Sequence, residues 1–184
     1  MNKYKNNKKI VLIVAGIGDT LCSTNSRKKI RNNESFVEQV KKVISHVTEE
    51  PSYYALVNFH YPSDTFKDVN VFDGYPATKN VSLKIHSNSL LLKDNEMALT
   101  ARDGEELLFN GDDFTFIFRP EEYDIYMCGI DLHGIFANSI KDLLSEGYNV
   151  HLFSDALSAF PQTHKYVNNL QKNKNFEFCS YKSV

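Results

Sequence analysis

An unbroken run of branched apolar residues near the start of the chain limits the folds open to it. The run is Ile10-Val11-Leu12-Ile13-Val14, and it contains no polar residue that would mark a solvent-facing side. A strand of this kind is buried on both faces, which is typical of a parallel sheet covered by helices on each side. The segments Tyr53–Phe59 and Asp124–Ile130 are also mostly apolar. Together the three segments predict a central, mainly parallel sheet.

Two amphipathic segments are predicted to cover that sheet. Residues Ser35–His46 repeat apolar side chains at helical spacing, and residues Ile135–Ser145 do the same. Gly147 stands where a glycine commonly closes a helix. The alternation of strands and helices predicts a three-layer α/β/α domain. Two further strands are expected over Asn149–Phe153, ending at Ser154–Asp155, and over Phe176–Cys179.

The rest of the chain carries weaker patterns. Proline and glycine interrupt residues 60–108, where only Val81–Ile85 alternates like a short strand. Pro161 suits the first turn of a helix that carries Val167 and Leu170. No stretch reads as a linker between domains. We therefore predict a frayed leader over residues 1–8 and a single domain over residues 9–184.

The composition excludes some classes of binding partner and indicates a cellular compartment. The chain has 184 residues, of which 24% are charged, and a formal net charge of -2. It lacks the basic excess of nucleic-acid-binding proteins. Its longest apolar run falls short of the about 18 residues that suggest a membrane helix. Three widely spaced cysteines, Cys22, Cys128 and Cys179, suit a reduced cytoplasmic protein. We expect no nucleic acid, membrane, cofactor or metal partner.

The C-terminal third resembles a known superfamily. The resemblance begins in a predicted strand and the helix after it, Tyr126-Met127-Cys128-Gly129-Ile130-Asp131-Leu132-His133-Gly134-Ile135-Phe136-Ala137. It continues in two shorter segments, Gly147-Tyr148-Asn149-Val150 and Asp155-Ala156. This order and spacing resemble the isochorismatase-like hydrolases, which include nicotinamidases and related amidases. Weaker similarities to the same superfamily lie over Lys9–Leu21, Val57–Pro62 and Leu108–Phe114. The resemblance implies the α/β fold of that superfamily for the domain.

The catalytic residues implied by the resemblance are not kept. Amidases of this superfamily use a Cys nucleophile, an Asp base and a Lys that stabilises developing charge. Matched by motif, the Cys position falls on Ile135 and the Lys position near Asp103. The Asp position falls on Ala15, or on Gly16 if the register shifts by one residue. The pair that binds metal in relatives falls on Phe59 and Tyr61.

Three polar residues are candidates for a replacement acid–base set. Asp19 follows the first strand, while Asp131 and His133 follow the strand that ends at Ile130, where sheets of this class place their sites. Asp19 also suits a turn, and His133 a residue bonded at a helix start. Cys128 is expected as a buried apolar thiol, with a displaced nucleophile as the alternative. The expected pocket lining is Phe59, His60, Tyr61, Ile130, Gly134, Ile135 and Phe136.

Two main functions follow from these observations. In the favoured one, the protein keeps the fold without the catalysis and acts as a small-molecule-binding, regulatory or assembly protein. In the alternative, it is a divergent hydrolase of a small amide or vinyl ether, with Asp19, Asp131 and His133 as acid–base groups. A weaker third interpretation is a thiol sensor through Cys22. A small-molecule ligand and a homo-oligomer are compatible with the first two.

Overall fold

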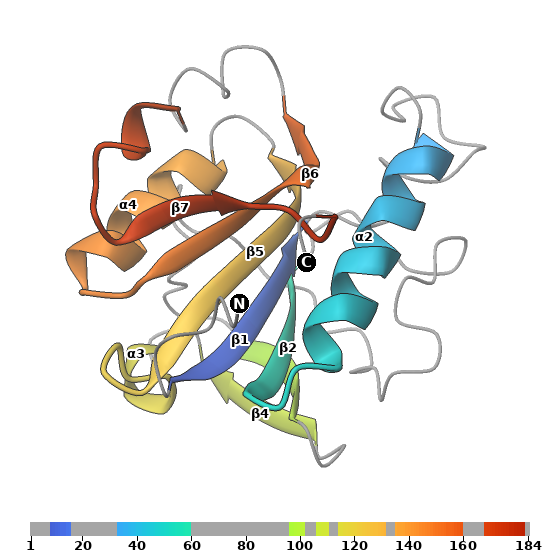
Figure 1. Ribbon diagram of the computed structural model, residues 1–184. Helices are drawn as coiled ribbons and strands as arrows, with labels where there is room; N and C mark the ends of the chain where they lie inside the picture. Colours follow the sequence, from blue (N-terminus) through green and yellow to red (C-terminus); the bar gives the residue numbers. More distant parts are fainter. Residues whose placement is uncertain are drawn as a thin grey trace.

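The computed structural model describes residues 8–15, 33–59, 96–101, 106–110, 114–131, 135–159 and 168–182. Within these residues the strands form one sheet in the spatial order β4-β3-β2-β1-β5-β6-β7 (Figure 1). The neighbours β2-β1-β5-β6-β7 pair in parallel, whereas β3 is antiparallel to both β2 and β4. The strands are β1 (Lys9–Ala15), β2 (Tyr53–Phe59), β3 (Glu96–Ala101), β4 (Glu106–Asn110), β5 (Tyr123–Asp131), β6 (Val150–Ala159) and β7 (Phe176–Cys179).

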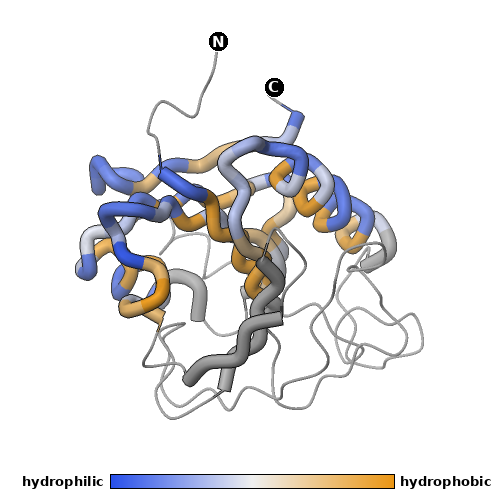
Figure 2. The backbone as a smooth tube through the Cα atoms, turned by 90° about the horizontal axis from the view of Figure 1, so that it is seen from below, coloured by the Kyte–Doolittle hydropathy of each residue, from blue (hydrophilic) through white to orange (hydrophobic). Residues whose placement is uncertain are grey.

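Helices lie on both faces of the sheet, which confirms the three-layer prediction. Helix α2 (Asn33–Thr48) covers one face, and α4 (Ile135–Ser145) covers the other together with the short α3 (Phe114–Ile117) (Figure 1). Apolar and polar residues alternate along α2 in Figure 2. The side chains that this helix buries against the sheet are all apolar: Phe36, Val37, Val40, Val43, Ile44 and Val47.

Strand β1 lies at the centre of the sheet, between β2 and β5. Every residue from Ile10 to Ala15 is buried. Successive residues face opposite layers: Leu12 packs into the cluster beneath α2, and Ile13 packs into the cluster beneath α3 and α4. The apolar run therefore does what the sequence predicts, because neither face of this strand reaches solvent.

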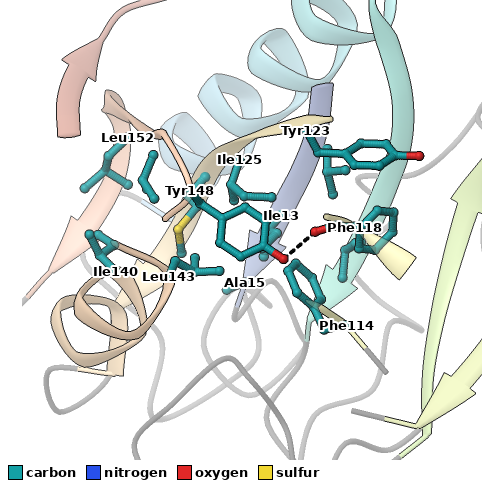
Figure 3. Close-up of a cluster of buried hydrophobic side chains, with 14 of the residues drawn as sticks. Ile13, Ala15, Phe114, Phe118, Tyr123, Ile125, Ile140, Leu143, Tyr148 and Leu152 are labelled. Carbon is teal, nitrogen blue, oxygen red and sulfur yellow. Dashed lines mark hydrogen bonds between the residues drawn. The ribbon is translucent and has the colours of Figure 1, made fainter. Parts of the chain in front are cut away.

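An aromatic cluster holds α3 against the sheet (Figure 3). The ring of Phe118 lies 5.0 Å from that of Phe114 and 5.4 Å from that of Tyr123, in edge-to-face arrangements. The hydroxyl of Tyr148, which is fully buried, donates a hydrogen bond to the carbonyl oxygen of Phe118. That bond satisfies the one polar group of Tyr148 inside an otherwise apolar layer, so burial of the ring carries no unpaired hydroxyl.

Gly147 closes α4 as predicted. It has a φ of 92°, which side chains with a Cβ rarely adopt. The amide of Tyr148 donates to the carbonyl oxygen of Leu143, and that of Gly147 donates to Leu144. This pair of bonds is the Schellman motif that ends many helices.

The structure corrects two expectations about strands. Strand β6 does not end at Ser154–Asp155 but continues to Ala159. The pair β3–β4, in the weakly patterned stretch, is not anticipated by the sequence. The predicted strand Val81–Ile85 and the start of the helix at Pro161 lie outside the described residues.

Among the residues that the structure describes, no helix has both the length and the apolar character needed to cross a membrane.

Candidate active site

The carboxyl ends of the parallel strands bring the predicted positions together. In the strand register, Ala15 of β1 pairs with Phe59 of β2 on one side and with Gly129 of β5 on the other. Gly129 in turn pairs with Leu157 of β6. Open α/β sheets place their ligands at this edge. Ala15 and Phe59, which stand at the Asp and metal-binding positions implied by the resemblance, are therefore neighbours.

A side chain on Gly129 would point directly at the backbone of β1 at this edge. The φ of Gly129, 122°, lies in a region that only glycine occupies readily. A Cβ placed on Gly129 would lie 2.0 Å from the carbonyl oxygen of Ala15 and 2.8 Å from the Ala15 nitrogen. No side chain fits there, so this position requires glycine both for its φ and for the contact with the Ala15 backbone.

The described side chains of β1 and β5 at this edge are apolar. Ala15 and Ile130 are each 1% exposed, and Cys128 is fully buried. Ala15 lies in the cluster beneath α3 and α4, together with Ile13, Val57 and Met127. Neither Ala15 nor Ile130 offers an atom that could exchange a proton or attack a substrate.

Cys128 behaves as a buried thiol. Burial raises its pKa far above the ordinary value, and the nearby carboxylate of Asp155 raises it further. Because the thiolate is the nucleophile in cysteine catalysis, a thiol held neutral in this way is inert. The structure thus favours the expectation of a small apolar residue over that of a displaced nucleophile.

Strand β6 carries an irregularity opposite Cys128. Its pairing with β5 passes from Met127–Leu152 to Gly129–Leu157, so β6 contains three more residues than β5 over this interval. Asp155 lies in this segment, inside the strand, whereas the sequence predicts that the strand ends there. Its Oδ2 accepts a hydrogen bond of 2.6 Å from the hydroxyl of Ser180, whereas its Oδ1 is buried without a partner.

The other predicted site residues are only partly placed. The backbone positions of Asp131, Phe59, Ile135 and Phe136 are described, at the ends of β5 and β2 and at the start of α4, but their side chains lie outside the described part. In the strand register Asp131 stands opposite Ala159 of β6. Wholly outside the described residues are Gly16, Asp19, Cys22, His60, Tyr61, Asp103, His133 and Gly134. The coupling of Asp131 with His133 remains a prediction.

A polar cluster that sequence reasoning missed lies at the opposite, amino-terminal ends of the strands. Asp124 of β5 accepts a 2.8 Å hydrogen bond from the side-chain amide of Asn149, and the ammonium of Lys8 lies 3.5 Å from the same Oδ1 atom. His151 of β6 and Glu177 of β7 complete the cluster. Asp124, His151 and Glu177 are each the second residue of their strand, after an aromatic or branched apolar residue. That repeated apolar–polar start is the signal that could have found them.

Metal binding finds no support in the described part of the chain, where no three His, Cys, Asp or Glu side chains gather closely enough to hold an ion.

Comparison with known proteins gives a result for structure alone. No family model and no curated protein matches the chain. An isochorismatase-like hydrolase from Alkaliphilus metalliredigens matches with a TM-score of 0.61 and 14% identity over 95% of each chain. A MAR1 ribonuclease from Caenorhabditis elegans matches with a TM-score of 0.62 and 14% identity over 97% of this chain and 80% of its own. For N-carbamoylsarcosine amidase from Thermoplasma acidophilum the values are 0.57 and 15%, over 96% and 98%.

These neighbours differ in the activity that their names state, while they share one architecture. Fold therefore does not set the chemistry, which depends on the residues at the site. At such low identity the likeness speaks for the fold, and it agrees with the motif order of the C-terminal third. The chain has the α/β fold of the isochorismatase-like hydrolases.

Proposed function

We propose that this protein keeps the isochorismatase-like fold without its hydrolytic chemistry and acts in the cytoplasm as a small-molecule-binding, regulatory or assembly protein. The observation that carries the proposal is Ala15, a buried methyl group at the position that the motif match gives to the catalytic Asp. A methyl group cannot take or return a proton, and loss of one member of a cooperating catalytic set costs several orders of magnitude in rate.

The carboxyl end of β5 supports the same proposal. A side chain on Gly129 would collide with the backbone of Ala15, so β5 can present none at this residue. Cys128, which precedes Gly129 in β5, is buried, and its raised pKa keeps the thiol neutral. The edge can still border a small apolar or mixed ligand, because strand ends in this fold remain the natural place for one.

A second candidate function rests on Asp131. This carboxylate belongs to the last residue of β5, beside Ile130 and level with the end of β6. A hydrolase of a small amide or vinyl ether would use Asp131 with Asp19 and His133 as acid–base groups. In that case the neighbouring charge on Asp131 would help to hold the imidazolium form of His133.

Activity and binding assays on one preparation separate the two functions. The purified protein is incubated with nicotinamide and with isochorismate, and product is compared with a control that lacks protein. A panel of small carboxylates and amides is then tested for binding by the shift in thermal unfolding temperature. We expect no turnover of either substrate and a concentration-dependent shift with at least one member of the panel.

Variants sharpen the result. Ala15→Asp should stay inactive and lose about 2–4 kcal/mol of unfolding free energy, because it places a carboxylate among apolar side chains. Ala15→Ser, which adds one hydroxyl, should lose less. Turnover that Asp131→Asn abolishes and Asp142→Asn leaves unchanged would overturn the proposal in favour of the divergent hydrolase. Asp142 is the matched control because it lies on the partly exposed side of α4.

A further inference from the structure

Two tyrosine rings meet beside a lysine at the amino-terminal edge of the sheet, opposite the candidate active site. The Nζ atom of Lys9, the first residue of β1, lies 4.9 Å from the ring centroid of Tyr54 on β2 and 5.6 Å from that of Tyr123 on β5. The two centroids are 5.3 Å apart, and the ring planes are tilted by 58°. We call this pair of rings the aromatic corner. Because an aromatic face attracts a cation within about 6 Å, the corner attracts one from two sides.

An irregularity in β2 turns Tyr54 toward the corner. The pairing of β2 with β1 passes over Tyr54, which is an extra residue in the register. Tyr53 packs beneath α2, whereas Tyr54 and Ala55 both pack on the opposite face of the sheet. Successive residues of a regular strand face opposite sides, so only this bulge places Tyr54 on the same face as Tyr123. Bulges of this kind commonly re-aim a side chain at a functional site.

Lys9 occupies the corner loosely. Its side chain is exposed, and among the described residues the two rings are the partners that the structure gives for its ammonium group. The ammonium of the preceding Lys8 is bonded elsewhere, to the carbonyl oxygen of Pro120 and beside the carboxylate of Asp124. A cation–π contact at an exposed position is weak. A better cation can therefore displace the side chain of Lys9.

We propose that the aromatic corner is a binding site for a small methylated ammonium ion, and that Lys9 is its resident, displaceable occupant. A primary ammonium has three N–H donors and is strongly hydrated, so it loses much of its water when it lies against aromatic carbon. A quaternary ammonium has no N–H group to leave unsatisfied and presents methyl groups to the rings, which is the mode in which aromatic rings recognise such ions. The exchange makes and breaks no covalent bond.

The surroundings of the corner favour a cation over a neutral molecule. Glu122 is exposed, and its carboxylate is near enough to add to burial and to Tyr54 in raising the pKa of Tyr123. A negative charge beside the rings strengthens the attraction that their faces already provide. The backbone carbonyl oxygen of Glu122 also accepts a hydrogen bond of 2.8 Å from the amide of Lys9. This bond holds the backbone of Lys9 in β1 when its side chain moves away.

An NMR titration of the full chain with tetramethylammonium chloride tests the site. The ring and amide signals of Tyr54 and Tyr123 are followed, with sodium chloride as the control for ionic strength and tert-butanol as a neutral molecule of similar size. We expect saturable shifts with a dissociation constant in the millimolar range, because the corner offers two aromatic faces and lies beside an exposed side chain. Neither control should reproduce these shifts.

Removal of the resident lysine is the sharpest variant. Lys9→Ser should bind tetramethylammonium about two- to fivefold more tightly than the wild-type protein, which is the range that one exposed cation–π contact is worth. Lys182→Ser is the matched control, because the ammonium of Lys182 lies 5.6 Å from the single ring of Tyr181. It should leave the affinity of the corner unchanged.

Removal of one ring gives a second comparison. Tyr54→Leu keeps an apolar side chain at a half-buried position and should weaken binding about two- to fivefold. If this variant does not fold, the comparison of Lys9→Ser with the wild-type protein decides. No saturable shift in Lys9→Ser, equal affinities in Lys9→Ser and the wild-type protein, an equal response to tert-butanol, or an unchanged affinity in folded Tyr54→Leu would each overturn the proposal.

Discussion

The backbone of Gly129 and the carbonyl group of Ala15 approach so closely that the space for a Cβ atom between β5 and β1 is already filled. This contact lies at the carboxyl edge of the sheet, where the register aligns Ala15 with Phe59 and Gly129 with Leu157. The shape of the candidate site therefore depends on a residue that has no side chain.

Replacement of Gly129 by Ala should be among the most costly single changes in the chain. The new methyl group meets the Ala15 oxygen at 2.0 Å, and the backbone stays at a φ of 122° that alanine rarely adopts. We expect a loss of about 3–5 kcal/mol in the free energy of unfolding, measured in urea.

Gly147→Ala is the matched control for that change. Its φ is also positive, at 92°, but the added methyl group would meet only the Cβ atom of Pro120, at 3.9 Å. The cost should be about 1 kcal/mol, from backbone strain alone. Similar losses for the two variants would show that the contact with the Ala15 backbone is not what requires a glycine at residue 129.

The hydroxyl of Tyr148 provides a second stability test. Tyr148→Phe keeps the ring in its apolar layer but removes the donor to the Phe118 carbonyl oxygen (Figure 3). A loss of about 1–2 kcal/mol is expected, because a buried acceptor loses a bond that water cannot replace. Thermal or urea unfolding measures it, and an unchanged midpoint would mean that this bond contributes nothing to the fold.

Cys128 should resist thiol reagents in the native protein. Its burial and raised pKa leave almost no thiolate at pH 8, so alkylation should wait for unfolding. Mass spectrometry of digested, labelled protein follows each cysteine separately, and the half-buried Cys179 is the internal comparison. Labelling of Cys128 at the rate of an exposed thiol would restore it as a candidate nucleophile.

Alkaline pH should weaken the fold through Tyr123. Burial, helped by the nearby Tyr54 and Glu122, raises the pKa of Tyr123 to about 12 from an ordinary value of 10.0. Between these two values the folded chain keeps a proton that the unfolded chain releases. Stability therefore falls as the pH rises through this window, by up to about 1.4 kcal/mol per pH unit for each such proton.

Urea unfolding at pH 9, 10 and 11 checks the sign and the source of that effect. Tyr123→Phe should show a shallower decline than the wild-type protein, although the buried Tyr148, whose pKa is also raised by burial, keeps part of it. Tyr181→Phe, a half-buried tyrosine near the end of the chain, should decline as the wild-type protein does. A decline that is the same in all three would assign it to other groups.

The sequence predicts best those elements whose burial follows from the spacing of apolar residues within a short segment. Residues Ile10–Val14 have no solvent face, and residues Ile135–Ser145 have one apolar stripe followed by Gly147, so strand and helix follow from spacing alone. The continuation of β6 through Ser154 and Asp155 could not be read in the same way. In the sequence, these two polar residues suggest that the strand ends. In the structure, Ser154 donates a hydrogen bond to the carbonyl oxygen of Cys179, and Asp155 accepts one from Ser180, so both residues can remain in the strand.

Strand β3 was missed for a related reason. Its sequence Glu96-Met97-Ala98-Leu99-Thr100-Ala101 contains mostly helix-favouring residues, and it becomes a strand by pairing with β2 and β4. For the candidate site, the motif match aligned Ala15 and Phe59 with positions that the register then showed to be neighbours. The closeness of Gly129 to Ala15 is invisible in the sequence, because it depends on a backbone angle and on a partner strand far along the chain.

The central position of β1 has a consequence for the order in which the chain can be assembled during synthesis. Lys9 pairs with Tyr123, and Ala15 pairs with Gly129. The partner of one whole edge of β1 is therefore synthesised more than 100 residues after β1 itself. Until then β2 is the described strand that can pair with β1, and an unpaired backbone edge flanked by apolar side chains invites pairing with other chains. Pairing between strands so far apart in the chain also slows folding, because the entropy cost of closing a long loop comes before the favourable contacts form. The native pairing of β1 on both of its edges therefore cannot be complete before β5 has been synthesised.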